Sequence, residues 1–276
     1  MKFGFVVPGG DIDAQVAMGQ SIEAAGWDGV FVAELVYGVD AWVTLGALAA
    51  TTKRIRLGTL LTPPSRRRPW TLASQLVSVD RLSGGRAVIS VGLGALDTGF
   101  AAVGEATDRK ERAELLDESL DLLNLFQAGG PFQHHGHHHQ VEWGGQWALK
   151  PIQKPRVPVW SVGLWPNPRS MARPLRFDGI LPATRDANGD HAALTADDVK
   201  ALVEYVADHR EATTPFDIVL EGVTPVGNPD AAAEVVRPLA DAGATWWIES
   251  MWQAPGGPEE VQARIADGPP PLNSRS

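Results

Sequence analysis

IRLGTLLTPPSRRRPWTLASQLVSVDRLSGGRAVISVGLG, residues 55–94, carries the pattern that decides the fold. It begins with a short apolar run at Ile55–Leu61, continues as a helical pattern at Trp70–Leu82, and ends in a second apolar run at Ala87–Gly92. Ser83-Gly84-Gly85 supplies residues that commonly end a helix. Because a strand, a helix and a strand follow one another, this stretch predicts a βαβ unit with parallel strands.

The same alternation extends in both directions along the chain. The other expected strands are Phe3–Val7, Gly29–Ala33, Val157–Val162, Gly179–Leu181, Phe216–Glu221 and Thr245–Glu249. The other expected helices are Ile12–Ala25, Ala41–Thr51, Arg109–Gln127, Pro166–Arg176, Thr195–Arg210, Pro229–Ala242 and Glu259–Ala266. Eight strands, each followed by a helix, predict an α/β fold: a single-domain (β/α)₈ TIM barrel over residues 1–276, with a coil tail at 268–276.

An open, doubly wound sheet is the second candidate for the fold. Its first turn, Pro8-Gly9-Gly10-Asp11, lacks the glycine spacing of a dinucleotide-binding fingerprint. Residues 128–157 interrupt the alternation, and we expect a hairpin there. This segment contains five histidines between residues 134 and 139. Since no other ligand types are spaced for one face, a solvated hairpin is favoured over a metal site, and no metal is expected.

Composition and charge exclude several classes of protein. The chain has 276 residues, no cysteine and a net charge of −9, which excludes disulfides and thiolate chemistry and argues against general nucleic-acid binding. No apolar stretch is long enough to cross a bilayer, and no leader precedes the first strand, so we expect a cytoplasmic protein. Arg66-Arg67-Arg68 is interpreted first as a solvated loop and second as an anion site.

The active site of such a barrel lies where its strands end. Three carboxylates follow strands, Glu34, Glu221 and Glu249, and each could act as a general acid or base. Gly92-Leu93-Gly94, with Asp97, and Gly163, before Asn167-Pro168, could bring backbone N–H groups close to a phosphate. Ser161, Thr62, Thr184 and Arg185 also stand at predicted strand ends.

Several segments, taken in order, resemble the luciferase-like flavin monooxygenases. These are AWVTLGALAATTKRIRLGTLLTP (41–63), RPWTLASQLVSVDRLSGGR (68–86), AVISVGLG (87–94), LKPIQKPRVPVWSVG (149–163), RFDGILP (176–182) and LADAGATWWIE (239–249). The resemblance covers nearly the whole chain and is most specific between Leu57 and Gly94.

The resemblance implies a barrel that binds FMN or, in some members, the deazaflavin coenzyme F-420. It implies that the flavin ring rests on a bulge, often with a non-prolyl cis peptide, at Leu60, Leu61 and Thr62. It implies a phosphate held by Gly92, Gly94 and Gly163, with Arg169 nearby.

Family members often carry a polar pair such as Asp-His after the second strand. Here the position is Glu34-Leu35, so a histidine acid/base cannot be carried over and Glu34 is the only substitute at that position. The predicted function is a flavin-dependent oxidoreductase or monooxygenase that uses reduced FMN as cosubstrate, or F-420, on a small organic molecule. The alternatives are a flavin-binding barrel with little catalysis and a cofactor-free hydrolase. A flavin reductase and a second copy of the chain are the expected partners.

Overall fold

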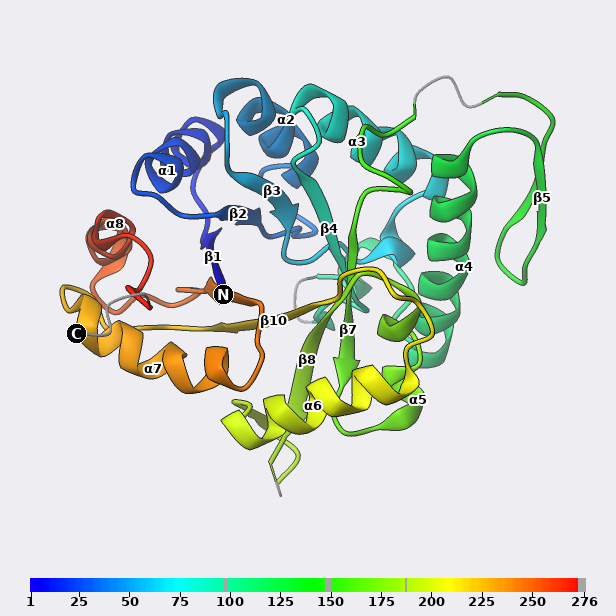
Figure 1. Ribbon diagram of the computed structural model, residues 1–276. Coiled ribbons are helices and arrows are strands. Elements are labelled where there is room, and N and C mark those ends of the chain that lie inside the picture. Colours follow the sequence, from blue (N-terminus) through cyan, green and yellow to red (C-terminus); the bar gives the residue numbers. More distant parts are fainter. Residues whose placement is uncertain (97–98, 147–149, 187, 273–276) are drawn as a thin grey trace. The chain divides into compact units, whose positions relative to one another are not determined.

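A computed structural model describes residues 1–96, 99–146, 150–186 and 188–272. Within them, eight parallel strands alternate with helices (Figure 1). The strands are β1 (Lys2–Val7), β2 (Gly29–Val32), β3 (Arg56–Thr59), β4 (Ala87–Val91), β7 (Val159–Leu164), β8 (Gly179–Arg185), β10 (Asp217–Gly222) and β11 (Trp246–Glu249). The sheet order is β10-β11-β1-β2-β3-β4-β7-β8, and the pairing of β8 with β10 closes it. The predicted (β/α)₈ barrel is confirmed, and the open sheet is wrong.

The helices begin and end close to their predicted bounds. They are α1 (Ile12–Ala24), α2 (Ala41–Thr51), α3 (Pro69–Leu82), α4 (Arg109–Ala128), α5 (Pro168–Met171), α6 (Ala196–His209), α7 (Pro229–Asp241) and α8 (Gly257–Asp267), with 3-10 turns η1 (Pro64–Arg66), η3 (Ala101–Val103) and η4 (Pro174–Arg176). Thr195 and Asp198 form a capping box at the start of α6. The Asn228 side chain accepts from the Ala231 N–H and caps α7.

The helix predicted over Pro166–Arg176 is wrong as a single element. The structure divides it into the four-residue α5 and the 3-10 turn η4. Pro174 has no N–H to donate and its ring crowds the preceding turn, so an α-helix does not continue through it. The strand predicted at Gly179–Leu181 is longer than expected, because β8 runs on to Arg185 and pairs there with a short antiparallel strand, β9 (His191–Ala192).

The chain divides into two compact units. The first comprises Met1–Phe31, Arg54–Arg56 and Val159–Ser276, and the second comprises Val32–Lys53 and Leu57–Pro158. In the first unit, the rings of Phe31, Trp160 and Trp246 form a buried cluster. The ring centroids of Trp160 and Trp246 lie 5.3 Å apart and those of Phe31 and Trp160 lie 5.6 Å apart. These large rings fill interior volume next to β1, β7 and β11.

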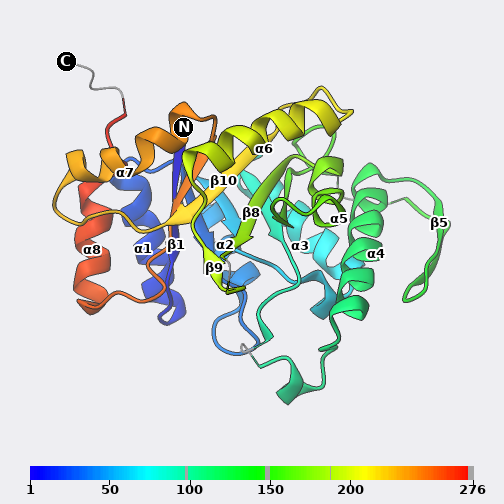
Figure 2. The same cartoon turned by 90° about the horizontal axis from the view of Figure 1, so that it is seen from below.

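The second unit contains the interruption predicted at residues 128–157. Strands β5 (Phe132–His135) and β6 (Gln140–Trp143) pair as an antiparallel hairpin, so the expected hairpin is confirmed. The hairpin stands beside α4 in Figures 1 and 2. Leu116, Leu120 and Leu123 of α4 are buried, and Phe126 near its end packs edge-on against Phe132, with ring centroids 4.9 Å apart.

Helices long and apolar enough to span a membrane are absent from the described residues. Residues 268–272 form neither helix nor strand, as the predicted coil tail requires, and residues 273–276 lie outside the described residues. Most of the described tryptophans are buried, whereas Trp70 and Trp252 are exposed.

Candidate functional site

The backbone changes course where β3 ends. The peptide bond between Leu60 and Leu61 is cis, although neither residue is proline. Strand pairing resumes at Thr62, whose N–H donates to the Ser90 carbonyl at 2.9 Å and which bridges to Val91. The predicted non-prolyl cis peptide at this position is confirmed.

Glu34 lies directly after β2 and is bonded at both carboxylate oxygens. Its Oε2 accepts from the Thr62 hydroxyl at 2.8 Å and from the Trp42 indole N–H at 3.3 Å. Its Oε1 accepts from Arg67 Nε at 2.6 Å. The Glu34 side chain is only 3% exposed. The structure therefore joins the ends of β2 and β3 through one buried carboxylate, which holds the Thr62 hydroxyl in place.

The three consecutive arginines have different surroundings. Arg67 bonds Glu34 and reaches Asp40 Oδ2 at 3.3 Å. Burial works against ionisation of Asp40, but the Val43 N–H and the Arg67 charge together hold the pKa of its carboxyl below the ordinary value. Arg66 is half-buried over the Phe100 ring, whereas Arg68 is exposed. The solvated-loop interpretation is therefore right for Arg68 and wrong for its two neighbours.

Arg66 also has unused hydrogen-bonding capacity. Its Nε and Nη1 are buried and have no hydrogen-bond partner among the described residues. Its Nη2 donates to the Leu35 carbonyl at 3.4 Å. The Ser90 hydroxyl, on β4 in the same unit, is likewise buried without such a partner. Buried donors without acceptors are costly, so an anionic ligand would be stabilised beside Arg66.

The loop after β4 is folded back on itself. Gly94 has a φ of +77°, and a Cβ there would lie 3.0 Å from both Pro63 and Phe100. Arg112, reaching from α4, donates to the carbonyls of Leu93 and Gly94. Internal packing thus accounts for glycine at position 94, whether or not a phosphate binds there. Asp97 lies outside the described residues.

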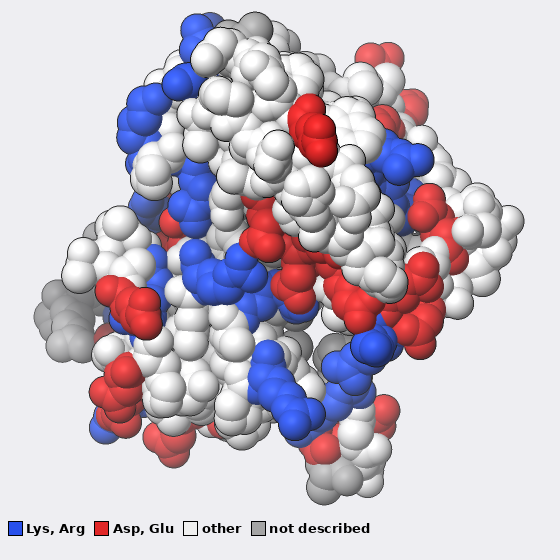
Figure 3. All heavy atoms as spheres, turned by 90° about the vertical axis from the view of Figure 1, so that its right-hand side faces the viewer, with Lys and Arg blue, Asp and Glu red and all other residues white. Residues whose placement is uncertain are grey.

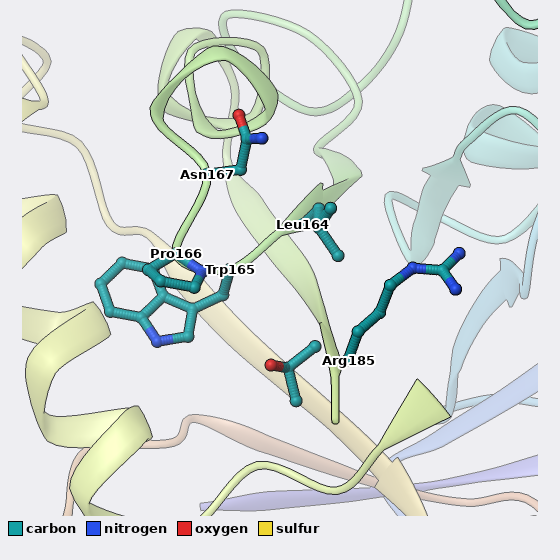
Figure 4. Close-up of a pocket in the computed structure, with 6 residues that line it drawn as sticks. Leu164, Trp165, Pro166, Asn167 and Arg185 are labelled. Atoms are coloured by element: carbon teal, nitrogen blue, oxygen red, sulfur yellow. The ribbon is translucent and has the colours of Figure 1, made fainter. Parts of the chain in front are cut away.

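Gly163 and Arg169 belong to the other unit. A Cβ on Gly163 would lie 2.9 Å from Ile180 and 3.0 Å from Pro174, so packing again accounts for the glycine. Arg169 is exposed on α5. Beside α5, an open pocket of about 310 Å³ is lined by Leu164, Trp165, Pro166, Asn167, Thr184 and Arg185. Trp165, just after β7, and Arg185, at the end of β8, border it (Figure 4).

Glu249, at the end of β11, has no exposed surface. It accepts from the Thr224 N–H at 2.6 Å and from the Thr224 hydroxyl at 2.8 Å. Its Oε2 lies 3.3 Å from both the Trp247 indole nitrogen and Arg264 Nη2. Burial lowers the pKa of Arg264, and the charge of Glu249 opposes that effect. This closed network ties α8 to the end of β11.

Glu221, at the end of β10, has different surroundings. Its side chain is exposed to solvent, yet enough protein surrounds it that burial raises the pKa of its carboxyl above the ordinary value. A hydrogen bond with Trp252 and the charge of His191 act in the opposite direction. Of the three predicted carboxylates, Glu221 therefore has the surroundings best suited to proton exchange with a small molecule.

The model of a family described as luciferase-like monooxygenase matches residues 1–267. The chain belongs to the luciferase-like monooxygenases.

Similar proteins include both curated sequences and solved structures. A Mycobacterium tuberculosis protein described as uncharacterized is 30% identical over 211 residues, which cover 75% of this chain and 65% of that protein. The coenzyme F-420-dependent tetrahydromethanopterin reductase of Methanopyrus kandleri has a TM-score of 0.76 at 17% identity, covering 96% of this chain and 97% of that one. The oxygenating constituent of 3,6-diketocamphane monooxygenase from Pseudomonas putida has a TM-score of 0.71 at 14% identity, covering 97% of each chain. These structural likenesses show the shared fold.

In this member of the luciferase-like monooxygenase family, the predicted site residues fall into separate groups. Leu60, Leu61, Thr62 and Glu34 are brought together by the β2 and β3 ends, and Gly92 and Gly94 follow β4 in the same unit. Glu221 and Glu249 have separate partners in the other unit. Sequence reasoning missed Trp42, Thr224 and Arg264, since each lies 8 to 25 positions away from the carboxylate it contacts.

Glu34→Gln tests the role of the buried ion pair. The variant removes the charged partner of Arg67, whereas glutamine still offers an acceptor to Thr62. We expect the free energy of unfolding to fall by about 1–3 kcal/mol, as for lost hydrogen bonds to charged groups. Asp40→Asn is the matched control, because asparagine still caps α2 and the exposed Arg67–Asp40 pair should contribute less than about 1 kcal/mol. Urea unfolding measures the free energy of unfolding of both variants. Equal losses in Glu34→Gln and Asp40→Asn would contradict a special role for Glu34.

Proposed function

We propose that the chain is a flavin-dependent oxidoreductase that uses reduced FMN as cosubstrate to oxidise a small organic molecule. The family match over residues 1–267 carries this proposal. One structural neighbour is described as dependent on coenzyme F-420 and another was solved in complex with FMN. A deazaflavin is therefore the alternative cofactor, and hydride transfer the alternative reaction.

The residues of the second unit fit a phosphorylated cofactor. Arg66 offers two buried N–H donors without partners among the described residues, and Ser90 offers a hydroxyl. A phosphate accepts strong hydrogen bonds from a guanidinium, which would satisfy these groups. Leu60, Leu61 and Thr62 would lie under the ring, with Gly92 and Gly94 nearby. The contribution that the family resemblance implies for Gly163 and Arg169 stays a prediction.

The protein's own part in the reaction is to bind, orient and move protons. When bound, a reduced flavin supplies two electrons, either for oxygen-atom transfer from O₂ or as a hydride. Glu34 and Arg67 fix the Thr62 hydroxyl, so that wall of the site does not reorganise when a ligand arrives. Glu221 is the residue proposed to exchange a proton with the substrate, since burial raises its pKa above the ordinary value.

Arg66→Met tests the anion site. Methionine keeps an apolar chain over Phe100 but removes the guanidinium. We expect FMN affinity to fall about tenfold to a hundredfold, the equivalent of losing charge-assisted hydrogen bonds. Arg68→Met is the matched control, because Arg68 is exposed, and its FMN affinity should stay near the wild-type value. Calorimetric titration of oxidised and reduced FMN measures both.

The same titrations separate the competing functions. Binding of F-420 in preference to FMN would make F-420 the cofactor of the proposed reaction. Flavin binding without O₂ uptake or substrate oxidation, in the presence of a flavin reductase, would favour a binding protein over an enzyme. If the purified chain binds neither cofactor, the proposal is wrong and the cofactor-free hydrolase becomes the better candidate.

A further inference from the structure

The turn of the β5–β6 hairpin is fixed against α4 by one side chain. Glu118 of α4 accepts hydrogen bonds from three successive backbone N–H groups, those of His137 at 2.6 Å, His138 at 3.0 Å and His139 at 2.9 Å. Burial disfavours the charged carboxyl, but these N–H groups hold the pKa of Glu118 below its ordinary value. Glu118 is thus an anionic anchor that gives the turn one fixed position.

Gly136 makes this anchoring possible. A Cβ at position 136 would collide with the Glu118 carboxylate and would lie 2.6 Å from His134 Nε2. Any larger residue would therefore push the turn away from α4. The absence of a side chain lets Glu118 reach the three N–H groups that follow.

The anchored turn brings two imidazoles to a second carboxylate. Glu114 lies four residues before Glu118, so both side chains share one face of α4. Its Oε2 is 3.2 Å from His138 Nε2 and 3.5 Å from His137 Nδ1. All three atoms lie within 4.8 Å of one another. Two ligands of a tetrahedral zinc ion, each bonded at about 2.0–2.1 Å, are about 3.3 Å apart, so both distances match such a site.

We propose that Glu114, His137 and His138 bind a divalent transition-metal ion, with Zn²⁺ as the expected occupant. Two imidazole nitrogens and one carboxylate oxygen are ligands that zinc uses, and the fourth position would hold water. The His137 side chain is 80% exposed, so the ion can enter and that position stays open to solvent. This proposal differs from the expectation from sequence that no metal binds, and it is independent of the proposed flavin chemistry.

The surrounding charge favours a cation. Glu118 lies behind the ligands as a carboxylate, and acidic side chains gather in a central band on the side of the molecule that faces the viewer in Figure 3, where α4 lies. Lys110 Nζ is 3.6 Å from Glu114 Oε1, the oxygen that is not assigned to the metal, and its side chain is 87% exposed. An exposed lysine can turn into solvent, so it does not block the site.

Calorimetric titration of Zn²⁺ into the full, tag-free, chelator-treated chain tests the proposal. We expect one ion per chain. His137→Ala and Glu114→Gln should each weaken binding by more than about tenfold, and Glu118→Gln by about 10–100-fold, since outer partners orient the ligands. His135→Ala is the matched control, because His135 lies on the same hairpin but its ring bonds Gln140 instead. Its affinity should stay at the wild-type value.

Two further readouts distinguish a metal site from a hydrogen-bonded turn. Co²⁺ in the wild type should give the visible absorption of a four-coordinate ion, and His137→Ala should lose it. Acidification should weaken Zn²⁺ binding, since protons compete for the ligand atoms. Circular dichroism checks that each variant is folded. Sub-stoichiometric binding, or equal affinity in the wild type and His137→Ala, would overturn the proposal and leave the contact between His138 and Glu114 as a plain hydrogen bond.

Discussion

Glu221→Gln should lower turnover by about 10² to 10⁴, the range typical of lost proton transfer. Glutamine has nearly the same shape but cannot exchange a proton. Flavin affinity should stay near the wild-type value, since Glu221 is not among the residues proposed to hold the cofactor. The assay is turnover of a substrate found by screening the wild type with reduced FMN. Glu234→Gln, an exposed carboxylate lost from α7 in the same unit, is the control for the change in net charge.

The pH dependence gives an independent check on Glu221. As a general base it must be ionised, so kcat/KM should rise with pH through its raised pKa, and this limb should vanish in Glu221→Gln. Trp252→Phe removes the hydrogen bond that lowers this pKa, so the limb should move to higher pH. The linked effect on stability has the opposite sense: the contribution of a carboxyl with a raised pKa is present at low pH and is lost as pH rises through the folded-state value.

Turnover of Glu221→Gln within a few-fold of the wild type would remove Glu221 from the reaction. If kcat/KM still rises with pH in Glu221→Gln, another group is responsible for the titration. If the rise of kcat/KM with pH occurs at the same pH in Trp252→Phe as in the wild type, the indole does not set the pKa of Glu221.

Arg264→Met should destabilise the chain by about 3–5 kcal/mol, the usual cost of removing one partner from a buried ion pair. Arg264 is 1% exposed and Glu249 is 0% exposed, so water cannot replace the lost contact. The variant leaves the Glu249 carboxylate buried without its cation, and it also removes the donor to the Gly268 carbonyl at 2.8 Å. Urea unfolding should show a lower midpoint.

The double variant makes this prediction sharper. Arg264→Met combined with Glu249→Leu removes both charges and leaves apolar groups, which is often neutral or even stabilising relative to the broken pair. We therefore expect the double variant to be more stable than Arg264→Met alone, with strong coupling between the two sites. Lys110→Met, which breaks an exposed pair, should cost less than about 1 kcal/mol. Additive effects at Arg264 and Glu249 would contradict a tightly coupled pair.

Local sequence signals predicted most of the fold. Thr195 and Asp198 marked the start of α6 correctly, because capping needs only residues three positions apart. The apolar runs located all eight barrel strands, because a strand buried on both faces is apolar along its length. Pro174 is the local signal that divides the helix predicted over 166–176, because its ring and missing N–H prevent an α-helix from continuing. The two-residue β9 is too short to produce a periodic pattern.

The candidate site was less predictable because its contacts join distant positions. The strand-end rule selected Glu34, but nothing in the sequence indicated that Arg67, 33 residues away, would bond its carboxylate. The histidine cluster was visible, whereas its third ligand, Glu114, lies 24 residues before His138 on a helix. Such pairings depend on how the hairpin turn packs on α4, which one sequence does not specify.

The pairing of β1 with β11 has a consequence for how this protein is made. Lys2 lies opposite Trp246 in that pair, so β1 cannot form this pairing until Trp246 has been synthesised. At about 5–20 residues per second, that delay is roughly 10–50 s. Throughout it, the apolar segment Phe3–Val7 has an unpaired edge, which is the kind of strand that aggregates. We therefore expect a nascent chain of this topology to be prone to aggregation until β11 has been translated.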